Sequence, residues 1–216
     1  TVPINYDTTT MCGLTPMTAG KCGNECEWEY NHATKELTIS GSDSMTNYGT
    51  KGAPWYAQRD NITTIKISGV STIGNYAFEG CTQITQISLP STVTTIGDYA
   101  FTGCTQMKIE SWGAVTKIGT QAFYNCDGLT SIEIPSGTTY IGSKAFAESG
   151  NLTSVIFKGG SQPTTCETDA FTNIKATYVD VLIGYSSPKF CGKTPRTIDS
   201  CGASQTACKY TYYHDN

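Results

Sequence analysis

Cysteine is the residue type in this chain whose spacing most directly raises a question of chemistry. Three of the ten cysteines, Cys81, Cys104 and Cys126, are separated by 23 and 22 residues. A row of thiols at a near-constant interval could hold a soft metal ion or exchange disulfides. No histidine or carboxylate recurs in phase with them, so we interpret them as small buried groups that pack as hydrophobic side chains. Parallel side chains on neighbouring repeats suit a disulfide poorly, and we predict that all three are reduced.

The other seven cysteines lie near the two ends of the chain. Such clusters are typical of disulfides that close the ends of an extracellular protein, so they predict a secreted or cell-surface location. We interpret Cys22 and Cys26 as disulfide contributors and Cys166 as a partner of the C-terminal cysteines. An odd number leaves at least one of them unpaired or bonded to another chain. The disulfide candidates are Cys12, Cys22, Cys26, Cys166, Cys191, Cys201 and Cys208.

The sequence offers little for catalysis. A Cys–His nucleophile pair would need one of only two histidines, His32 or His214, and both lie in an expected turn or tail. The chain has no Gly-x-Ser-x-Gly elbow, no His-Glu-x-x-His motif and no phosphate-binding glycine loop. Carboxylates recur out of phase with the thiols, and no metal-ligand spacing is present. We therefore expect a protein that is not an enzyme and that uses no metal or cofactor.

Charge and hydropathy exclude two further classes of partner. Charged residues make up 15% of the chain and the formal net charge is −4, which argues against nucleic-acid binding. No apolar run approaches the roughly 20 residues that span a bilayer, so we expect no transmembrane segment in this chain. The first residue, Thr1, is not Met, which fits either a removed secretion signal or a trimmed chain. Asn61 and Asn151 begin N-x-Thr sequons and are glycosylation candidates.

A repeat must position all of these residues. The motif Ile-Gly-x-x-Ala-Phe recurs, with a degenerate last copy, so that its phenylalanines advance by 23, 22, 23 and 25 residues. A period in the twenties predicts a β-rich solenoid, whose units bury their apolar faces by stacking on one another. We expect the phenylalanines to form one column, each burial stabilising the fold by about 1.5–3 kcal/mol. They are Phe78, Phe101, Phe123, Phe146 and Phe171.

Each repeat opens with an apolar-x-x-apolar-x-apolar pattern, as in Ile84, Ile87 and Leu89. Alternation along a strand sends every second side chain into the core and leaves the others facing solvent. The residues 107–112 are one residue shorter than their counterparts, which predicts a kink or a shifted register there. A glycine follows the second apolar pair of four repeats, and we expect a tight turn with positive φ at these positions. These glycines are Gly74, Gly97, Gly119 and Gly142.

The flanks differ from the repeats. Residues 26–39 alternate around a turn and predict a β-hairpin, residues 178–183 read as one more strand, and residues 184–216 are turn-rich. Trp28 and Trp55 could stack on a ligand, but we favour packing over the end of the core.

The flanks and the repeats together divide the chain into three parts. We expect an N-terminal cap (1–60) with the hairpin, five repeats of about 23 residues (61–175) and a cysteine-rich C-terminal cap (176–216).

The repeat phrase resembles the BspA-like (Treponema-type) leucine-rich repeats. Residues 81–104 are the best copy, with Ile84, Leu89-Pro90, Ile96-Gly97 and Ala100-Phe101 in the expected order, and the likeness extends over about residues 22–175. The resemblance implies a leucine-rich-repeat right-handed superhelix with a parallel sheet on one face. It also implies a surface or secreted protein that binds host matrix, other cells or partner proteins.

Two functional hypotheses remain open. The first is a non-enzymatic adhesion or recognition protein that binds a protein or glycoprotein ligand through the concave face of the sheet. The second is a structural component of a cell wall, coat or extracellular array, with possible self-association. The solvent-facing candidates for binding are Lys66, Gln86, Ser88, Lys108, Glu110, Ser131, Glu133, Ser154 and Ile156.

Overall fold

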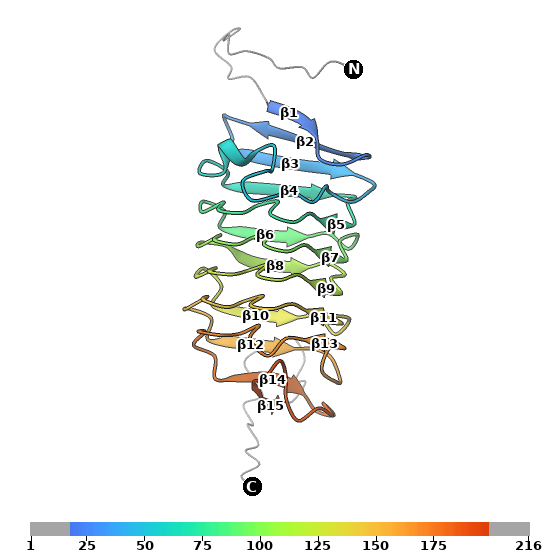
Figure 1. Ribbon diagram of the computed structural model, residues 1–216, viewed down its shortest axis with the longest axis vertical. Coiled ribbons are helices and arrows are strands. Elements are labelled where there is room, and N and C mark those ends of the chain that lie inside the picture. The colour runs from blue at the N-terminus through green and yellow to red at the C-terminus, as the bar shows by residue number, and fades with distance from the viewer. Residues whose placement is uncertain (1–17, 199–216) are drawn as a thin grey trace, which may run out of the picture.

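In the computed structural model, which describes residues 18–198, the chain is a stack of coils with a strand on each of two sides (Figure 1). The described range contains one helical element, the short 3-10 turn η1 (Tyr56–Gln58). The repeating apolar pattern explains this architecture, because each coil exposes core side chains that only a neighbouring coil can cover. The prediction of a β-rich repeat solenoid with a parallel sheet is confirmed.

The longer strands lie on one side of the stack. Strands β1, β2 and β3 pair antiparallel, and β3 pairs parallel with β4. Farther along, β6 pairs parallel with β8, and β10, β12, β14 and β15 form a second parallel group. The bounds are β1 (Thr18–Lys21), β2 (Cys26–Asn31), β3 (Glu36–Gly41), β4 (Thr64–Ser68), β6 (Gln86–Leu89), β8 (Lys108–Trp112), β10 (Ser131–Ile134), β12 (Ser154–Phe157), β14 (Tyr178–Leu182) and β15 (Thr194–Ile198).

Two-residue strands line a second side of the stack. In the described range they form one continuous parallel sheet of five strands, each in register with the next. The register is set by the repeated isoleucine, which points inward at successive levels. The strands are β5 (Thr72–Ile73), β7 (Thr95–Ile96), β9 (Lys117–Ile118), β11 (Tyr140–Ile141) and β13 (Thr165–Cys166).

The predicted irregularity at residues 107–112 is a shifted register in β8. Ser88 of β6 lies opposite Ser111, so Glu110 is the extra residue of a β-bulge. Strand β8 is therefore one residue longer than β6. The repeat is nevertheless one residue shorter than its neighbours, because the connections before and after β8 are each one residue shorter than those around β6. Glu110, one of the predicted binding residues, is therefore not aligned with Ser88, because the bulge gives that position to Ser111.

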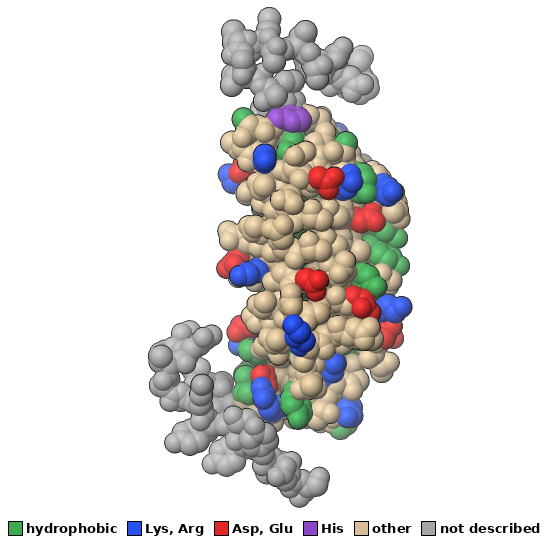
Figure 2. All heavy atoms as spheres, turned by 90° about the vertical axis from the view of Figure 1, so that its left-hand side faces the viewer, with side chains coloured by type: hydrophobic (Ala, Val, Ile, Leu, Met, Phe, Trp, Pro, Cys, Tyr) green, Lys and Arg blue, Asp and Glu red, His purple; other side chains and the backbone are tan. Residues whose placement is uncertain are grey.

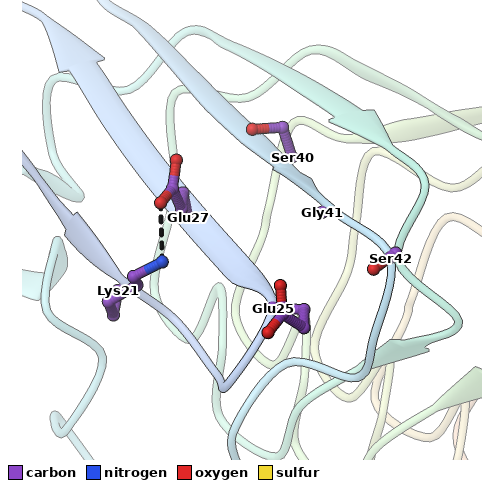
Figure 3. Close-up of a pocket in the computed structure, with 6 residues that line it drawn as sticks. All are labelled: Lys21, Glu25, Glu27, Ser40, Gly41 and Ser42. Carbon is purple, nitrogen blue, oxygen red and sulfur yellow. Dashed lines mark hydrogen bonds and ion pairs between the residues drawn. The ribbon is translucent and has the colours of Figure 1, made fainter.

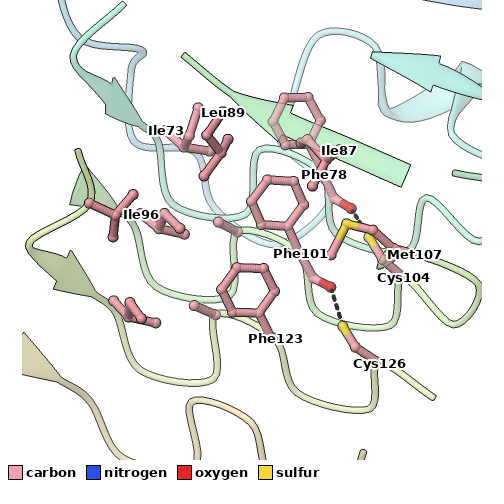
Figure 4. Packing of buried hydrophobic residues seen from close by; sticks show 14 of the residues in the cluster. Ile73, Phe78, Ile87, Leu89, Ile96, Phe101, Cys104, Met107, Phe123 and Cys126 are labelled. Carbon is pink, nitrogen blue, oxygen red and sulfur yellow. Dashed lines mark hydrogen bonds between the residues drawn. The ribbon is translucent and has the colours of Figure 1, made fainter. Parts of the chain in front are cut away.

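A column of aromatic rings runs through the centre of the stack (Figure 4). The five repeated phenylalanines are buried, and neighbouring rings are stacked with centroids 5.1–5.3 Å apart and interplanar angles of 3–21°. Trp55 extends the column beyond Phe78 at a centroid distance of 5.7 Å, and Phe190 lies 6.0 Å from Phe171 at the other end. Trp55 also donates a buried hydrogen bond from Nε1 to the carbonyl oxygen of Ala77, which fixes its ring.

The repeated glycines serve close stacking rather than a left-handed backbone. None of the four has positive φ, contrary to the sequence-based expectation. A Cβ at Gly97 would lie 2.7 Å from the backbone nitrogen of Asn75, and one at Gly119 2.7 Å from that of Asp98. Real Cβ atoms do not approach backbone so closely, so glycine is required for contact between coils.

The left-handed residues lie elsewhere in the repeat. The residue two positions after each column phenylalanine has positive φ in all five repeats, and only two of these residues are glycine. A short polar side chain tolerates this conformation better than a branched one. The five positions are Gly80, Gly103, Asn125, Glu148 and Asn173.

The flanking elements match the sequence in part. Strands β2 and β3 are the predicted hairpin, and β14 covers most of the predicted strand at 178–183. Residues 184–216 were expected to be turn-rich, and the structure adds one strand that was not predicted there, β15, which pairs with β14 over five residue pairs. The sequence of β15 has little alternation of apolar and polar residues, because it includes Pro195 and Arg196 side by side. No apolar pattern therefore predicted this strand.

We expect Gly119→Ala to lower the free energy of unfolding by about 1–3 kcal/mol, because its Cβ would overpack the contact between coils. Gly137→Ala is the matched control, since no atom lies within 4 Å of the Cβ it would add. Equilibrium unfolding in urea measures both variants. Equal stability of the two variants would contradict the close-stacking role.

Candidate functional site

The outward side chains of the long strands form two rows along the stack, which we call the sheet face. Register places Ser88 beside Ser111, and Glu133 beside Ile156, Asp180 and Arg196 in the first row. All nine predicted binding residues are exposed or half-buried. Seven of them lie in these rows, Lys66 lies on β4 opposite Thr38 of β3, and Glu110 is displaced by the bulge. The second row includes Gln86, Lys108, Ser131, Ser154, Tyr178 and Thr194.

Charges on the sheet face are mostly matched within it. Lys66 Nζ lies 2.9 Å from a carboxylate oxygen of Glu36, and Lys158 Nζ lies 3.3 Å from one of Glu133. These ion pairs are solvent-exposed and contribute little stability. Because the charges are paired, the sheet face has no strong electrostatic potential of one sign. A ligand would therefore be selected by shape and hydrogen bonding rather than by charge.

The C-terminal part of the sheet face combines an aromatic ring, a guanidinium group and an aliphatic side chain. Tyr178 is 49% exposed, and the guanidinium carbon of Arg196 lies 5.6 Å from its ring centroid. Arg196 donates from Nε and one terminal nitrogen to Asp180, at 2.6 and 2.9 Å. Ile156 is half-buried beside Asp180. Tyrosine and arginine are enriched among residues that dominate binding energy at protein interfaces.

Sequence reasoning did not select Tyr178, Asp180 or Arg196. The signal for Tyr178 was present, because residues 178–183 were predicted as a strand and continuing the alternation places it outward. Arg196 had no such signal, because β15 was not expected.

The side of the stack shown in Figure 2 carries few charged side chains through its middle. Uncharged polar side chains and backbone dominate this view, in keeping with a chain in which 15% of residues are charged. Surfaces of this kind do not attract polyanions by counterion release.

A shallow pocket lies near the antiparallel strands at the N-terminal end (Figure 3). Its volume is about 310 Å³ and it is open to solvent. Lys21 Nζ lies 2.6 Å from Glu27 Oε1, and this contact lowers the pKa of Glu27 from its ordinary value. Both groups are fully solvated, so the pocket offers no desolvated acid or base for catalysis. The lining residues are Lys21, Glu25, Glu27, Ser40, Gly41 and Ser42.

The three central thiols are buried and free, and they support the backbone (Figure 4). The thiols of Cys104 and Cys126 donate to the carbonyl oxygens of Phe78 and Phe101, each at 3.2 Å. Ser149 occupies the same position one repeat later and donates to Phe123 at 3.2 Å. Burial raises the pKa of Cys126 to about 12. Cys104 and Cys126 are therefore structural donors, and burial keeps all three thiols protonated because it raises the pKa of each.

Disulfides occur at both ends of the described range. Cys22 is bonded to Cys26 at the start of β2, and Cys166 of β13 is bonded to Cys191. The second bond holds the residue after Phe190, so it fixes the ring that ends the aromatic column. The candidates Cys12, Cys201 and Cys208 lie outside the described residues.

The two glycosylation candidates are both exposed, and each lies just before a long strand. Asn151 is held by its neighbours, because its Nδ2 donates to the carbonyl oxygen of Asp127 at 3.1 Å and its Oδ1 accepts from Lys175 at 3.1 Å. Asn61 lies at the turn that precedes β4. Both side chains are accessible at the surface, and glycosylation at either sequon stays a prediction.

Residues 18–198 contain no group of three or more His, Cys, Asp or Glu side chains that could hold a metal ion. Among the same residues, no helix is both long enough and apolar enough to cross a membrane. His32 contacts Thr18 and the ring of Tyr30 at the N-terminal end, away from the thiols.

We expect the buried thiols to make the fold less stable at alkaline pH. In the unfolded chain they ionise near 9.0, whereas burial raises the pKa of Cys81 and Cys126 to about 12 in the folded protein. Above pH 9 the unfolded state therefore binds fewer protons, and the free energy of unfolding falls between pH 9 and 12. Urea unfolding across this range measures the fall.

The matched control for the thiols replaces Cys81, Cys104 and Cys126 by serine, the residue that Ser149 already supplies at this position. Its free energy of unfolding should fall less than that of the parent between pH 9 and 12. If the free energy of unfolding fell equally steeply with pH in the two proteins, the buried thiols would not be the cause of the alkaline instability.

The chain resembles several solved structures. A leucine-rich repeat protein from Eubacterium ventriosum is 24% identical with a TM-score of 0.57, and the match covers 86% of this chain but only 60% of that one. One from Bacteroides ovatus is 20% identical, with coverage of 74% and 58% and a TM-score of 0.43. A leucine rich cell surface protein from Faecalibacterium prausnitzii is 17% identical, with coverage of 84% and 72% and a TM-score of 0.29.

A search of curated proteins found no significant match. The first of the three structures supports the fold alone, and this chain spans about three-fifths of its length. Residues 52–177 match the BspA type leucine rich repeat region, in six copies. The repeated motif, the column of phenylalanines and this match agree, and the chain belongs to the BspA-type leucine-rich repeat family.

Proposed function

We propose that this is a non-enzymatic recognition or adhesion protein, secreted or cell-surface, that binds a protein or glycoprotein of host matrix or cells through the sheet face. The observation that supports this most is the row of outward side chains held in register on a parallel sheet. Leucine-rich repeat domains generally bind proteins, and solenoids present extended surfaces suited to such partners.

Rigidity supports the proposal. Many outward side chains are attached to a strand whose inward neighbours are buried, for example Ile132 and Ile134 on either side of Glu133. A surface that is already ordered loses little conformational entropy when a partner binds. Binding energy is then concentrated where Tyr178, Ile156 and Arg196 meet.

The ends of the stack support an extracellular location. The Cys22–Cys26 and Cys166–Cys191 bonds tie the terminal units, and such bonds persist in oxidising compartments. We assign capping roles to the parts before residue 61 and after residue 175, and a right-handed superhelix to the repeats between them.

The test compares two triple variants with the same change in net charge. Tyr178→Ala, Ile156→Ser and Lys66→Ala together should weaken adhesion to immobilised matrix proteins and epithelial cells by about tenfold or more, because they remove side chains of the sheet face. The readout is a concentration-dependent adhesion assay with circular dichroism to confirm folding.

The control variant carries Lys117→Ala, Lys144→Ala and Glu167→Ala, three exposed positions away from the long strands. It should adhere like the parent. Adhesion of the sheet-face variant equal to that of the control would contradict the proposal.

A structural role in a wall, coat or array is the second candidate, favoured by strand direction. Strands β1 and β15 end the sheet at opposite ends of the described stack and run in the same direction (Figure 1). Head-to-tail contact between copies would therefore continue a parallel sheet and build an open assembly. Concentration-dependent growth in analytical ultracentrifugation would favour this role, and a monomer at all concentrations would count against it.

A further inference from the structure

The long strands do not form one continuous sheet, although the short strands do. Strand β8 has a ladder with β6, and β10 has a ladder with β12, but among the described strands β8 and β10 share none. At the same level β9 and β11 pair in register, and Phe123 stacks on Phe146 at 5.2 Å. At this level the stack is thus paired on the side of the short strands and unpaired on the side of the long strands, and we call the gap between β8 and β10 the seam.

The bulge and a large side chain explain the seam. Trp112 occupies the position held by Leu89 one coil earlier and by Ile134 one coil later. Its ring meets Phe123 and Phe146 edge-on, at 5.6 and 6.3 Å, so it fills the core on the β10 side of its own strand. Indole is much larger than an aliphatic side chain, and it keeps β10 from approaching β8.

Strand β8 is held toward its other neighbour. Ser111 Oγ donates to the carbonyl oxygen of Leu89 at 3.3 Å. Gly113 lies so close to the previous coil that an added Cβ would be 2.1 Å from the carbonyl oxygen of Pro90. The bonded edge of β8 therefore faces β6, and its free edge faces β10.

A second break, between β4 and β6, differs from the seam. There the two strands still approach each other closely, whereas β8 and β10 do not. At the seam Ile109 is half-buried, while its counterparts Ile65, Ile87 and Ile132 are 7%, 1% and 3% exposed. Ile67 near the end of β4 is half-buried as well, so partial exposure of a core side chain is not confined to the seam.

Two facing strand edges without a ladder present unpaired backbone N–H and C=O groups, which must find partners. The chemistry that matches such an edge is another extended backbone. We propose that the seam binds an extended peptide segment of the partner protein, which adds to the free edge of β8 or β10 as a strand. This inference rests on the proposed recognition role and specifies how the partner is held.

Side chains at the seam define the segment. The half-buried Ile109 accepts an apolar side chain from the partner, while Lys108 and Glu110 of β8 and Ser131 and Glu133 of β10 face solvent. The segment should therefore alternate apolar and polar residues, carry little net charge and lack proline, which cannot donate to a ladder.

The probe is a fluorescein-labelled synthetic peptide with the sequence of residues 152–158, which contain β12, the existing ladder partner of β10. Anisotropy titration should show saturable binding to the full chain. Two further peptides carry N-methyl groups at alternate residues, so that each lacks the backbone N–H donors along one edge of the strand. One of these two peptides should bind at least about tenfold more weakly than the unmodified peptide. Equal binding of all three peptides, or no binding, would overturn the inference.

A sealed variant tests the place of binding. Deletion of Glu110 combined with Trp112→Leu restores the geometry of the β6 strand and should reduce peptide affinity by about tenfold or more. Lys117→Ala on the short strand β9 keeps the backbone and the bulge of β8, and its affinity should stay within about twofold of the parent. Amide hydrogen exchange on the parent provides a readout that needs no variant. The peptide should protect β8 or β10, and protection elsewhere alone would refute the seam.

The two proposals fail separately. If the sheet-face variant loses adhesion but the peptide does not bind, the recognition role stands and the seam inference falls. If the peptide binds at the seam but the sheet-face variant adheres normally, the seam is a real site and the role of the sheet face is refuted.

Discussion

Stacking of one phenylalanine per coil is the interaction on which the rest of the structure depends. The rings lie within 5.3 Å of one another along the repeats, so a single coil cannot shift without opening its neighbour's core. Glycine at positions such as Gly119 permits this spacing, because any side chain there would collide with the coil beneath. Thiol and hydroxyl donors add hydrogen bonds to the backbone carbonyl oxygens of column residues, and those of Phe78 and Phe101 also accept from a backbone N–H.

Function is expected where this regularity relaxes. The aromatic column fixes the distance between neighbouring coils on the side of the short strands. On the other side, the distance between neighbouring long strands depends on the side chains of those strands. Trp112 and the bulge at Glu110 separate two of those strands, and Tyr178 adds an exposed ring near the C-terminal end. A rigid frame with a few local departures can hold a binding surface without the flexibility that would cost affinity.

Periodicity predicted the features that every coil shares, which were the solenoid, the phenylalanine column and the inward isoleucines. It did not predict features that occur once. Phe190 ends the column and β15 ends the sheet, yet neither repeats, so no interval indicated them. The glycine motif was found but explained wrongly, because a sequence cannot distinguish a residue chosen for its φ from one chosen for close contact. The shift at Glu110 was expected, but its register needed coordinates.

The central claim is that the aromatic column couples the coils into one cooperative unit. Native-state hydrogen exchange on Phe123→Ala tests it most directly, because exchange reports the stability of each coil separately. The account predicts that Phe123→Ala lowers the free energy of unfolding by about 3–5 kcal/mol, as for other large buried aromatic side chains. It also predicts that backbone amides lose protection from exchange in the coils on both sides of the substitution. A small loss confined to the coil of Phe123 would contradict it.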